Sequence, residues 1–223
     1  MQIIAHVQNE FRQKFGLPRQ AGLTEGLLST LVFEKEYGVE AAFRGLEGYS
    51  HLWVIWDFHD NKKTGWTPTV RPPRLGGNKR MGVFATRSPY RPNPIGLSCV
   101  ELVEIRQTAA HGVELVVRGA DMMDGTPVYD IKPYLPFADS IPDARAGFAG
   151  EHEKEALEVE MPDAVRQRLS QEEQETLESL LSQDPRPRYQ QDESRVYGFP
   201  FRGRDVHFRV EGGRVLVCSV EEE

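Results

Sequence analysis

Cysteine is scarce in this sequence. Only two of the 223 residues are cysteines, and Cys99 and Cys218 lie far apart in segments with the composition of strands. No metal-ligand spacing surrounds either of them, and the histidines are scattered along the chain. We therefore expect two buried free thiols rather than a disulfide, and no metal site.

Long apolar runs are missing as well. No stretch approaches the roughly 20 apolar residues that a membrane span requires. The first residues, MQIIAHVQNEF, lack the basic start and apolar stretch of a secretion signal. Hydrophobic residues make up 39% of the chain and charged residues 27%, which is ordinary for a globular protein. We expect a cytoplasmic protein with no membrane partner.

The common catalytic signatures are also absent. The sequence contains no G-x-G-x-x-G, no G-x-x-x-x-G-K-[ST], no H-E-x-x-H and no G-x-S-x-G. Standard motifs alone therefore indicate no more than a mostly-β protein.

Acidic residues are missing from one long stretch, although the net charge of the chain is −7. We call this stretch, residues 61–100, the basic segment. It also holds six prolines, Trp66 and Tyr90. A charge run is most often a solvated face, but the local field matters more to a phosphate backbone than the total charge does. We therefore predict a binding role for this segment. Its basic residues are Lys62, Lys63, Arg71, Arg74, Lys79, Arg80, Arg87 and Arg91.

Short β-like runs separated by Gly and Pro dominate the first 135 residues. This pattern predicts an antiparallel barrel or sandwich rather than a doubly wound sheet. In the predicted strand at residues 51–59, Leu52, Val54, Trp56 and Phe58 can face a core. The opposite face carries two polar residues, Asp57 and His59, at the end of the strand, where a site could lie. The predicted strands span residues 3–7, 27–33, 51–59, 82–86, 96–105, 112–118 and 128–131, and residues 37–43 could form a brief helix.

The character of the chain changes after Pro142. Residues 143–160 resemble an acidic linker or arm. Pro162 can start a helix, and Ser170 with Glu173 matches a capping box for a second helix. Gly212-Gly213 predicts a hairpin between residues 206–210 and 214–220. We expect three parts: a barrel domain (1–142), the linker (143–160) and a small α+β C-terminal unit (161–223).

Two segments could carry chemistry. In MGVFATRSPYRPNPIGLS, residues 81–98, prolines stiffen a loop around Arg87, Arg91 and Asn93, although a plain strand connection is an equal alternative. In ADMMDGTPVYDIKPYLPF, residues 120–137, Asp124-Gly125 predicts a turn. The simpler interpretation of this second segment is a turn followed by an edge strand.

These segments resemble the TsaA/TrmO-like family. The resemblance rests on RSPYRPNPIG and DGTPVYDIKPYLPF, together with PRQ at residues 18–20 and LEGYSHLWVIW at residues 46–56. It covers residue 3 to about residue 140 and continues through DPRPRYQ (184–190) and YGFPF (197–201). Proteins of that family are tRNA methyltransferases that act on threonylcarbamoyladenosine beside the anticodon.

The resemblance implies a fold, a cofactor and a partner. The expected fold is mostly β with some α: an antiparallel, non-Rossmann β-barrel that binds S-adenosylmethionine, with a small α+β C-terminal unit. It also implies a homodimer with the cofactor near the subunit boundary. Carried over to this sequence, the cofactor-binding residues are Pro18, Arg19, Gln20, His59, Asp60, Arg87, Ser88, Leu97, Asp124, Gly125, Thr126 and Pro127.

For the reaction, the N6 nitrogen of threonylcarbamoyladenosine needs a base. Asp130 is the first candidate, with Tyr134 or His59 as alternatives. Arg91 and Lys132 are candidates for the threonyl carboxylate, and tRNA would contact Arg71, Arg74, Lys79, Arg80 and Asn93, with bases stacking on Trp66 or Tyr90. A second basic patch is predicted at Arg186, Arg188, Arg195, Arg202 and Arg204. The rival functions are a non-catalytic RNA-binding barrel and a protein-interaction module.

Overall fold

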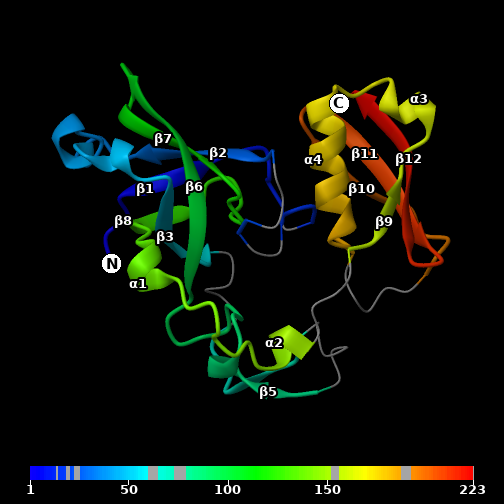
Figure 1. The fold of residues 1–223 in the computed structure, drawn as a ribbon, viewed down its shortest axis with the longest axis horizontal. Coiled ribbons are helices and arrows are strands. Elements are labelled where there is room, and N and C mark those ends of the chain that lie inside the picture. The colour runs from blue at the N-terminus through cyan, green and yellow to red at the C-terminus, as the bar shows by residue number, and fades with distance from the viewer. Residues whose placement is uncertain are drawn as a thin grey trace.

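The structure is a computed structural model that describes residues 1–13, 15–18, 21–22, 26–59, 65–72, 79–151, 156–186 and 192–222. It contains two main sheets, a closed six-stranded barrel and a four-stranded sheet near the C-terminus (Figure 1). Each sheet has its own cluster of buried apolar side chains. The fold is therefore mostly β, with a barrel and a smaller α+β unit, as the sequence predicts.

The barrel is antiparallel at every junction between neighbouring strands. Closure pairs each of these strands on both sides, which protects their backbone groups from pairing with another chain. Around the barrel the strands run β1 (Ala5–Gln8), β2 (Leu28–Phe33), β7 (Gly112–Arg118), β6 (Ile95–Thr108), β3 (His51–Asp57) and β8 (Pro127–Pro133).

Strand β3 shows why one end of the barrel carries a site. Leu52, Val54 and Trp56 point into the core as their alternation predicts. Asp57 differs from the prediction, because only 1% of it is exposed. The pairing of β3 with β8 shifts register between Ile55 and Trp56, which breaks the alternation and turns the next side chain inward. The Tyr129 hydroxyl donates to the buried Asp57 carboxylate at 2.5 Å.

The predicted strand at residues 82–86 is wrong. Only β5 (Met81–Gly82) is extended there, and it pairs with β4 (Thr69–Val70). Val83–Ala85 form a 3₁₀ turn, η5, because the Thr86 hydroxyl and backbone N–H both return to the Val83 carbonyl. The brief helix predicted at residues 37–43 is the 3₁₀ helix η1 (Glu40–Phe43), followed by η2 (Leu46–Gly48).

The two cysteines are free, as predicted, but they are not both buried. Cys99 is partly buried on β6, and burial raises the pKa of its thiol. Cys218 is exposed because it lies on the outer face of β12, whereas its neighbour Val217 is buried on the inner face. The composition of a strand does not reveal which of its two faces is covered.

The C-terminal sheet has the strand order β10-β11-β12-β9. Helix α4 (Gln171–Ser182) packs Leu177, Leu180 and Leu181 into its core. The predicted capping box is present, with Ser170 and Glu173 bonded to each other's backbone N–H, and Pro162 precedes α3 (Asp163–Arg166) as its N-cap. The strands are β10 (Tyr197–Phe201), β11 (Arg204–Glu211), β12 (Arg214–Glu222) and β9 (Glu158–Glu160), and the hairpin at Gly212-Gly213 joins β11 to β12.

The stretch predicted as a linker, residues 143–160, contains structure of its own. Its last residues form β9, which pairs in parallel with β12. Helices α1 (Pro136–Asp139) and α2 (Phe148–Glu151) lie before β9 along the chain.

The stretch between β1 and β2 leaves the barrel and reaches the C-terminal unit (Figure 1). We call the described residues of this stretch, 9–13, 15–18, 21–22 and 26–27, the bridging segment. Phe11 and Leu27 are buried in the C-terminal core, and Phe15 and Leu17 pack against it. The sequence places these residues with the barrel, yet their apolar side chains complete the other core.

Candidate cofactor site and nucleic-acid interface

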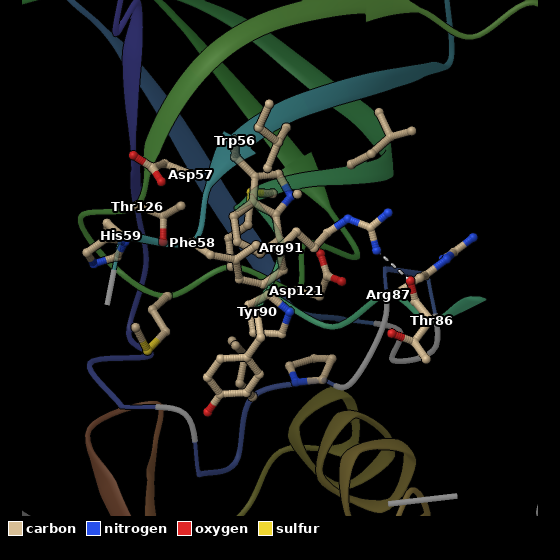
Figure 2. Close-up of a pocket in the computed structure, with 18 of the residues that line it drawn as sticks. Trp56, Asp57, Phe58, His59, Thr86, Arg87, Tyr90, Arg91, Asp121 and Thr126 are labelled. Carbon is tan, nitrogen blue, oxygen red and sulfur yellow. Dashed lines mark hydrogen bonds between the residues drawn. The ribbon is translucent and has the colours of Figure 1, made fainter. Parts of the chain in front are cut away.

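A cavity of about 740 Å³ opens at the end of the barrel. Four parts of the chain line it: β3 and its exit, the proline-rich loop with the start of β6, the turn between β7 and β8, and Leu17 and Pro18 of the bridging segment. Figure 2 shows the aromatic residues Trp56, Phe58 and Tyr90 in the middle of this wall. Asp57, His59 and Thr126 lie to one side of them and Thr86 and Arg87 to the other.

Among the polar side chains of the first cavity, Asp57 and Thr126 are buried, and the carboxyl group of Asp121 is partly buried. The Ser98 hydroxyl donates to it at 2.5 Å, and Ser98 in turn accepts from the Trp56 indole N–H at 2.9 Å. Burial raises the pKa of Asp121, while bonds from Ser98 and from the Ala21 backbone N–H, and the charge of Arg87, act in the opposite direction. The cavity therefore holds a desolvated acid beside a cation.

Gly96 makes this arrangement possible. A Cβ at that position would lie 2.1 Å from Cε2 of Trp56, which no side chain can occupy. The indole therefore lies flat over the backbone of β6, where its N–H reaches Ser98.

The loop that carries Arg87 is held in place by Arg91. Its guanidinium donates to the Val83 carbonyl at 3.0 Å and to the Thr86 carbonyl at 2.8 Å, the latter drawn as the dashed line in Figure 2. It also lies 5.3 Å from the centre of the Phe84 ring. Together with the prolines, these contacts order the loop before any ligand arrives.

A second cavity, of about 1250 Å³, is lined in part by the same loop. Thr86, Arg87, Pro89 and Tyr90 line both cavities. The second cavity adds two cations and two further rings, and part of its wall comes from α2. These lining residues are Arg71, Arg80, Phe84 and Phe148.

The structure brings five of the predicted cofactor residues together around the first cavity: Pro18, His59, Arg87, Leu97 and Thr126. Ser88 lines the second cavity instead. Arg19, Gln20 and Asp60 lie outside the described residues.

The remaining predicted cofactor residues have contacts that hold the turn. The Asp124 carboxylate accepts from the Asn9 backbone N–H at 3.0 Å. Gly125 has a φ of +74°, as a tight turn requires, and its N–H donates to the Val7 carbonyl at 2.7 Å. Pro127 begins β8, opposite His6.

The predicted catalytic and substrate residues do not gather in one place. Arg71 and Arg80 line the second cavity, and Arg91 lines the first while it braces the loop. Asp130, Lys132 and Tyr134 are not among the described residues that line either cavity. Lys79 and Asn93 are exposed near the loop, and Arg74 lies outside the described residues.

The predicted base, Asp130, lies on the outer face of β8, opposite Ile55 of β3. Asp130 forms an ion pair with Lys132 at 3.0 Å, and the Tyr134 ring packs 5.7 Å from that of Trp53. Lys132 thus already has a carboxylate partner. Asp130 and Tyr134 as catalytic groups stay a prediction.

The predicted second basic patch is largely neutralised by ion pairs. Arg186 pairs with Asp184, Arg202 with Glu172, and Arg204 with Glu173. Arg195 lies over the Tyr197 ring, and Arg188 is outside the described residues.

Sequence reasoning missed Asp121, Trp53, Met122 and Met123 as cavity residues. Asp121, Met122 and Met123 directly precede the predicted Asp124-Gly125 turn, so the sequence indicates where in the chain this part of the cavity wall lies. No local pattern marks which of its side chains are buried.

Within the described part of the chain, no group of three or more His, Cys, Asp or Glu side chains could hold a metal ion. None of the helices described there combines the length and the apolar composition of a membrane span.

Family models and relatives agree with this architecture. The tRNA-methyltransferase O N-terminal domain matches residues 6–140, and the TrmO C-terminal domain matches residues 154–223. A tRNA (adenine(37)-N6)-methyltransferase of Escherichia coli K12 is 51% identical over 148 residues, 66% of this chain and 62% of that protein. One from Eikenella corrodens is 49% identical over 173 residues, 77% of this chain and 97% of that protein.

A Pseudomonas aeruginosa PAO1 protein, provisionally named as an S-adenosylmethionine-dependent methyltransferase, is 41% identical over 213 residues, 92% of this chain and 90% of that protein. Among solved structures, a crystal structure of TrmO superposes with a TM-score of 0.78 at 35% identity, covering 98% of this chain and 97% of that one. The chain therefore belongs to the TrmO family of S-adenosylmethionine-dependent tRNA (adenine(37)-N6)-methyltransferases.

Proposed function

We propose that this chain methylates N6 of threonylcarbamoyladenosine at position 37 of tRNA, with S-adenosylmethionine as the methyl donor. The observation that carries the proposal is the shared wall of the two cavities. A mostly apolar cavity with a buried acid meets a basic, aromatic cavity at Thr86, Arg87, Pro89 and Tyr90. A small cofactor and a nucleotide can therefore approach each other across one loop.

The first cavity fits the cofactor in size and in chemistry. Its volume of about 740 Å³ lies within the roughly 300–1,000 Å³ of small-molecule sites. Arg87 suits the carboxylate of the amino-acid part, and the partly buried Asp121 suits its ammonium group. Trp53, Phe58 and Leu97 offer apolar surface for the adenine. When bound, S-adenosylmethionine supplies an electrophilic methyl group on its sulfonium.

The second cavity suits the tRNA. Arg71 and Arg80 can neutralise phosphates or the threonyl carboxylate, and Phe84 and Tyr90 offer rings on which a base can stack. His59, which lines the first cavity, is supported as the proton acceptor by its position in that wall. A tRNA-modifying activity also agrees with the cytoplasmic location that the sequence predicts.

We also propose that the protein is a homodimer, as the family resemblance implies. Leu97 lines the first cavity and is 57% exposed. It lies in register with Ile55 on the outer face of the barrel, next to the Trp53 and Cys99 pair. A second copy could cover this face, and light scattering of the purified protein would report the mass in solution.

Methyl transfer is tested directly with tRNA that carries threonylcarbamoyladenosine and with the same tRNA lacking it. We expect the purified protein and S-adenosylmethionine to give the N6-methylated nucleoside only with the modified tRNA, as read by nucleoside mass spectrometry. If the protein binds both tRNA and cofactor but no methyl group appears, the chemistry is wrong. Binding of tRNA without binding of the cofactor would favour a non-catalytic RNA-binding barrel.

Arg87→Ala should weaken the binding of S-adenosylmethionine by roughly ten- to a hundredfold, because a charged hydrogen-bonding partner contributes about 1.5–3 kcal/mol. Titration calorimetry measures the effect. Arg106→Ala is the matched control, because Arg106 pairs with Glu104 on the exposed part of β6. Equal cofactor affinity in the two variants would contradict the assignment of Arg87.

Asp121 should make cofactor binding depend on pH. Its pKa is raised above the ordinary 3.8, so the carboxylate that holds an ammonium group forms only as the pH rises through that raised value. Titration calorimetry over a pH series should show cofactor affinity increasing as the pH rises through the raised pKa of Asp121 in the native protein. In Asp121→Asn the affinity should not change over the same pH range.

The same shift has the opposite consequence for stability. Because the folded protein holds the Asp121 proton more tightly than the unfolded chain, this group favours folding at low pH and loses that contribution as the pH rises. At neutral pH, Asp121→Asn should therefore bind cofactor more weakly but unfold at a higher urea concentration. If cofactor affinity and resistance to urea both fell, or both rose, in Asp121→Asn, the role of Asp121 would be contradicted.

Arg80→Ala should weaken tRNA binding and reduce its salt dependence. Each lost phosphate contact lowers the slope of log affinity against log salt concentration by roughly 0.7–0.9. Fluorescence anisotropy between low and physiological salt measures the slope, with Arg106→Ala again as the control. An unchanged slope in Arg80→Ala would place the phosphates elsewhere.

A further inference from the structure

The bridging segment forms one wall of the first cavity. Leu17 and Pro18 line that cavity. The Ala21 backbone N–H bonds to the Asp121 carboxyl, and the Gly22 N–H donates to the Gly119 carbonyl at 2.9 Å. The segment therefore supplies apolar surface to the site and also satisfies its partly buried acid.

The same segment is anchored in the C-terminal unit. The Phe15 ring stacks 6.0 Å from that of Tyr197 and 6.3 Å from that of Phe208. Gly16, with a φ of +84°, passes so close to β10 that a Cβ there would lie 2.7 Å from the Phe199 ring. These contacts come immediately before Leu17 and Pro18 in the chain, so they set where the cavity wall lies.

Arg202 joins the two ends of the bridging segment to the C-terminal sheet. Its guanidinium donates to the Gly26 carbonyl at 2.9 Å and to Glu172 of α4 at 3.0 Å. Its backbone N–H donates to the Glu10 carboxylate at 2.5 Å. Burial raises the pKa of Glu10, and the hydrogen bond and charge of Arg202 oppose that rise. Arg202 therefore stabilises the Glu10 carboxylate. Arg202 has a φ of +49° in the turn after β10, which aims its N–H at Glu10.

We propose that the C-terminal unit positions the cofactor site through the bridging segment, with Arg202 as the positioning residue. The unit does this without reaching the cavity itself, because no described residue after Thr126 lines that cavity. The inference rests on the proposed role of the first cavity as the cofactor site. It assigns the C-terminal unit a part in cofactor binding that is separate from any contact with tRNA.

The proposal has a reciprocal consequence. If docking of the bridging segment raises the affinity for the cofactor by some factor, the cofactor must stabilise that docking by the same factor. Bound S-adenosylmethionine should therefore slow amide hydrogen exchange in α4 and β10, which lie outside the cavity wall. A C-terminal unit that only stabilises the fold would show no such slowing.

The decisive variant is Arg202→Gln. We expect its dissociation constant for S-adenosylmethionine to rise about tenfold in titration calorimetry, since the charged hydrogen bond from the guanidinium to the Gly26 carbonyl and its attraction to Glu10 are lost, whereas the backbone bond to Glu10 remains. Cofactor-dependent protection of α4 and β10 should disappear. Arg214→Gln is the control: Arg214 lies in the same sheet and pairs with Glu158 at 3.1 Å, away from the segment.

A second pair of variants keeps the test decisive if Arg202→Gln folds poorly. Gly16→Ala and Gly22→Ala both place a side chain at positive φ, +84° and +76°. Only the methyl group added at Gly16 would meet Phe199, because nothing lies within 4 Å of a Cβ at Gly22. We expect the substitution at Gly16 to weaken cofactor binding more than the one at Gly22.

The outcomes separate the two proposals. If the native protein binds no S-adenosylmethionine, the proposed function fails. If the native protein binds it and both Arg202→Gln and Gly16→Ala bind it as tightly as their controls, the proposed function stands and the positioning role is overturned.

Discussion

The partly buried carboxyl of Asp121 joins parts of the chain that are far apart in sequence. Ser98 bonds to it from β6, the Ala21 N–H from the bridging segment, and the charge of Arg87 acts on it from the proline-rich loop. A desolvated acid is costly unless such partners surround it. The barrel end, the loop and the bridging segment therefore have to assemble together, and the cavity is the space between them.

A second constraint follows from the loop that the two cavities share. The prolines and the bonds from Arg91 to the Val83 and Thr86 carbonyls order it in advance. A loop that is ordered in advance and lines both cavities can hold a small molecule and a nucleotide at a fixed spacing, which is the main requirement of a direct group transfer. Arg91 thus contributes to the site through the loop, and Arg87 is the cation that the loop presents to both cavities.

The C-terminal unit is connected to this site by packing rather than by lining it. Phe11, Phe15 and Leu27 are barrel-side residues by sequence order, yet they lie in or against the C-terminal core. A small four-stranded sheet with helix α4 and the short helix α3 has little apolar surface of its own to bury. Taking side chains from the bridging segment enlarges that core and at the same time fixes the segment beside the barrel.

The sequence by itself determined the strand-rich character, the capping box at Ser170, the hairpin at Gly212-Gly213 and the turn at Gly125, because each depends on short-range periodicity or on backbone angles that few residues adopt. Its motifs also indicated Arg87, His59 and Leu97, which share one cavity. Only the tertiary structure decided that Asp57 and Asp121 are buried or partly buried, that Arg91 braces the loop, and that Arg202 reaches Glu10. These outcomes depend on a register shift before Asp57, on the assembly of several segments around Asp121, and on a contact between Glu10 and Arg202, which lie 192 positions apart. The Arg91 bonds are local, but no local pattern shows which carbonyls its guanidinium reaches.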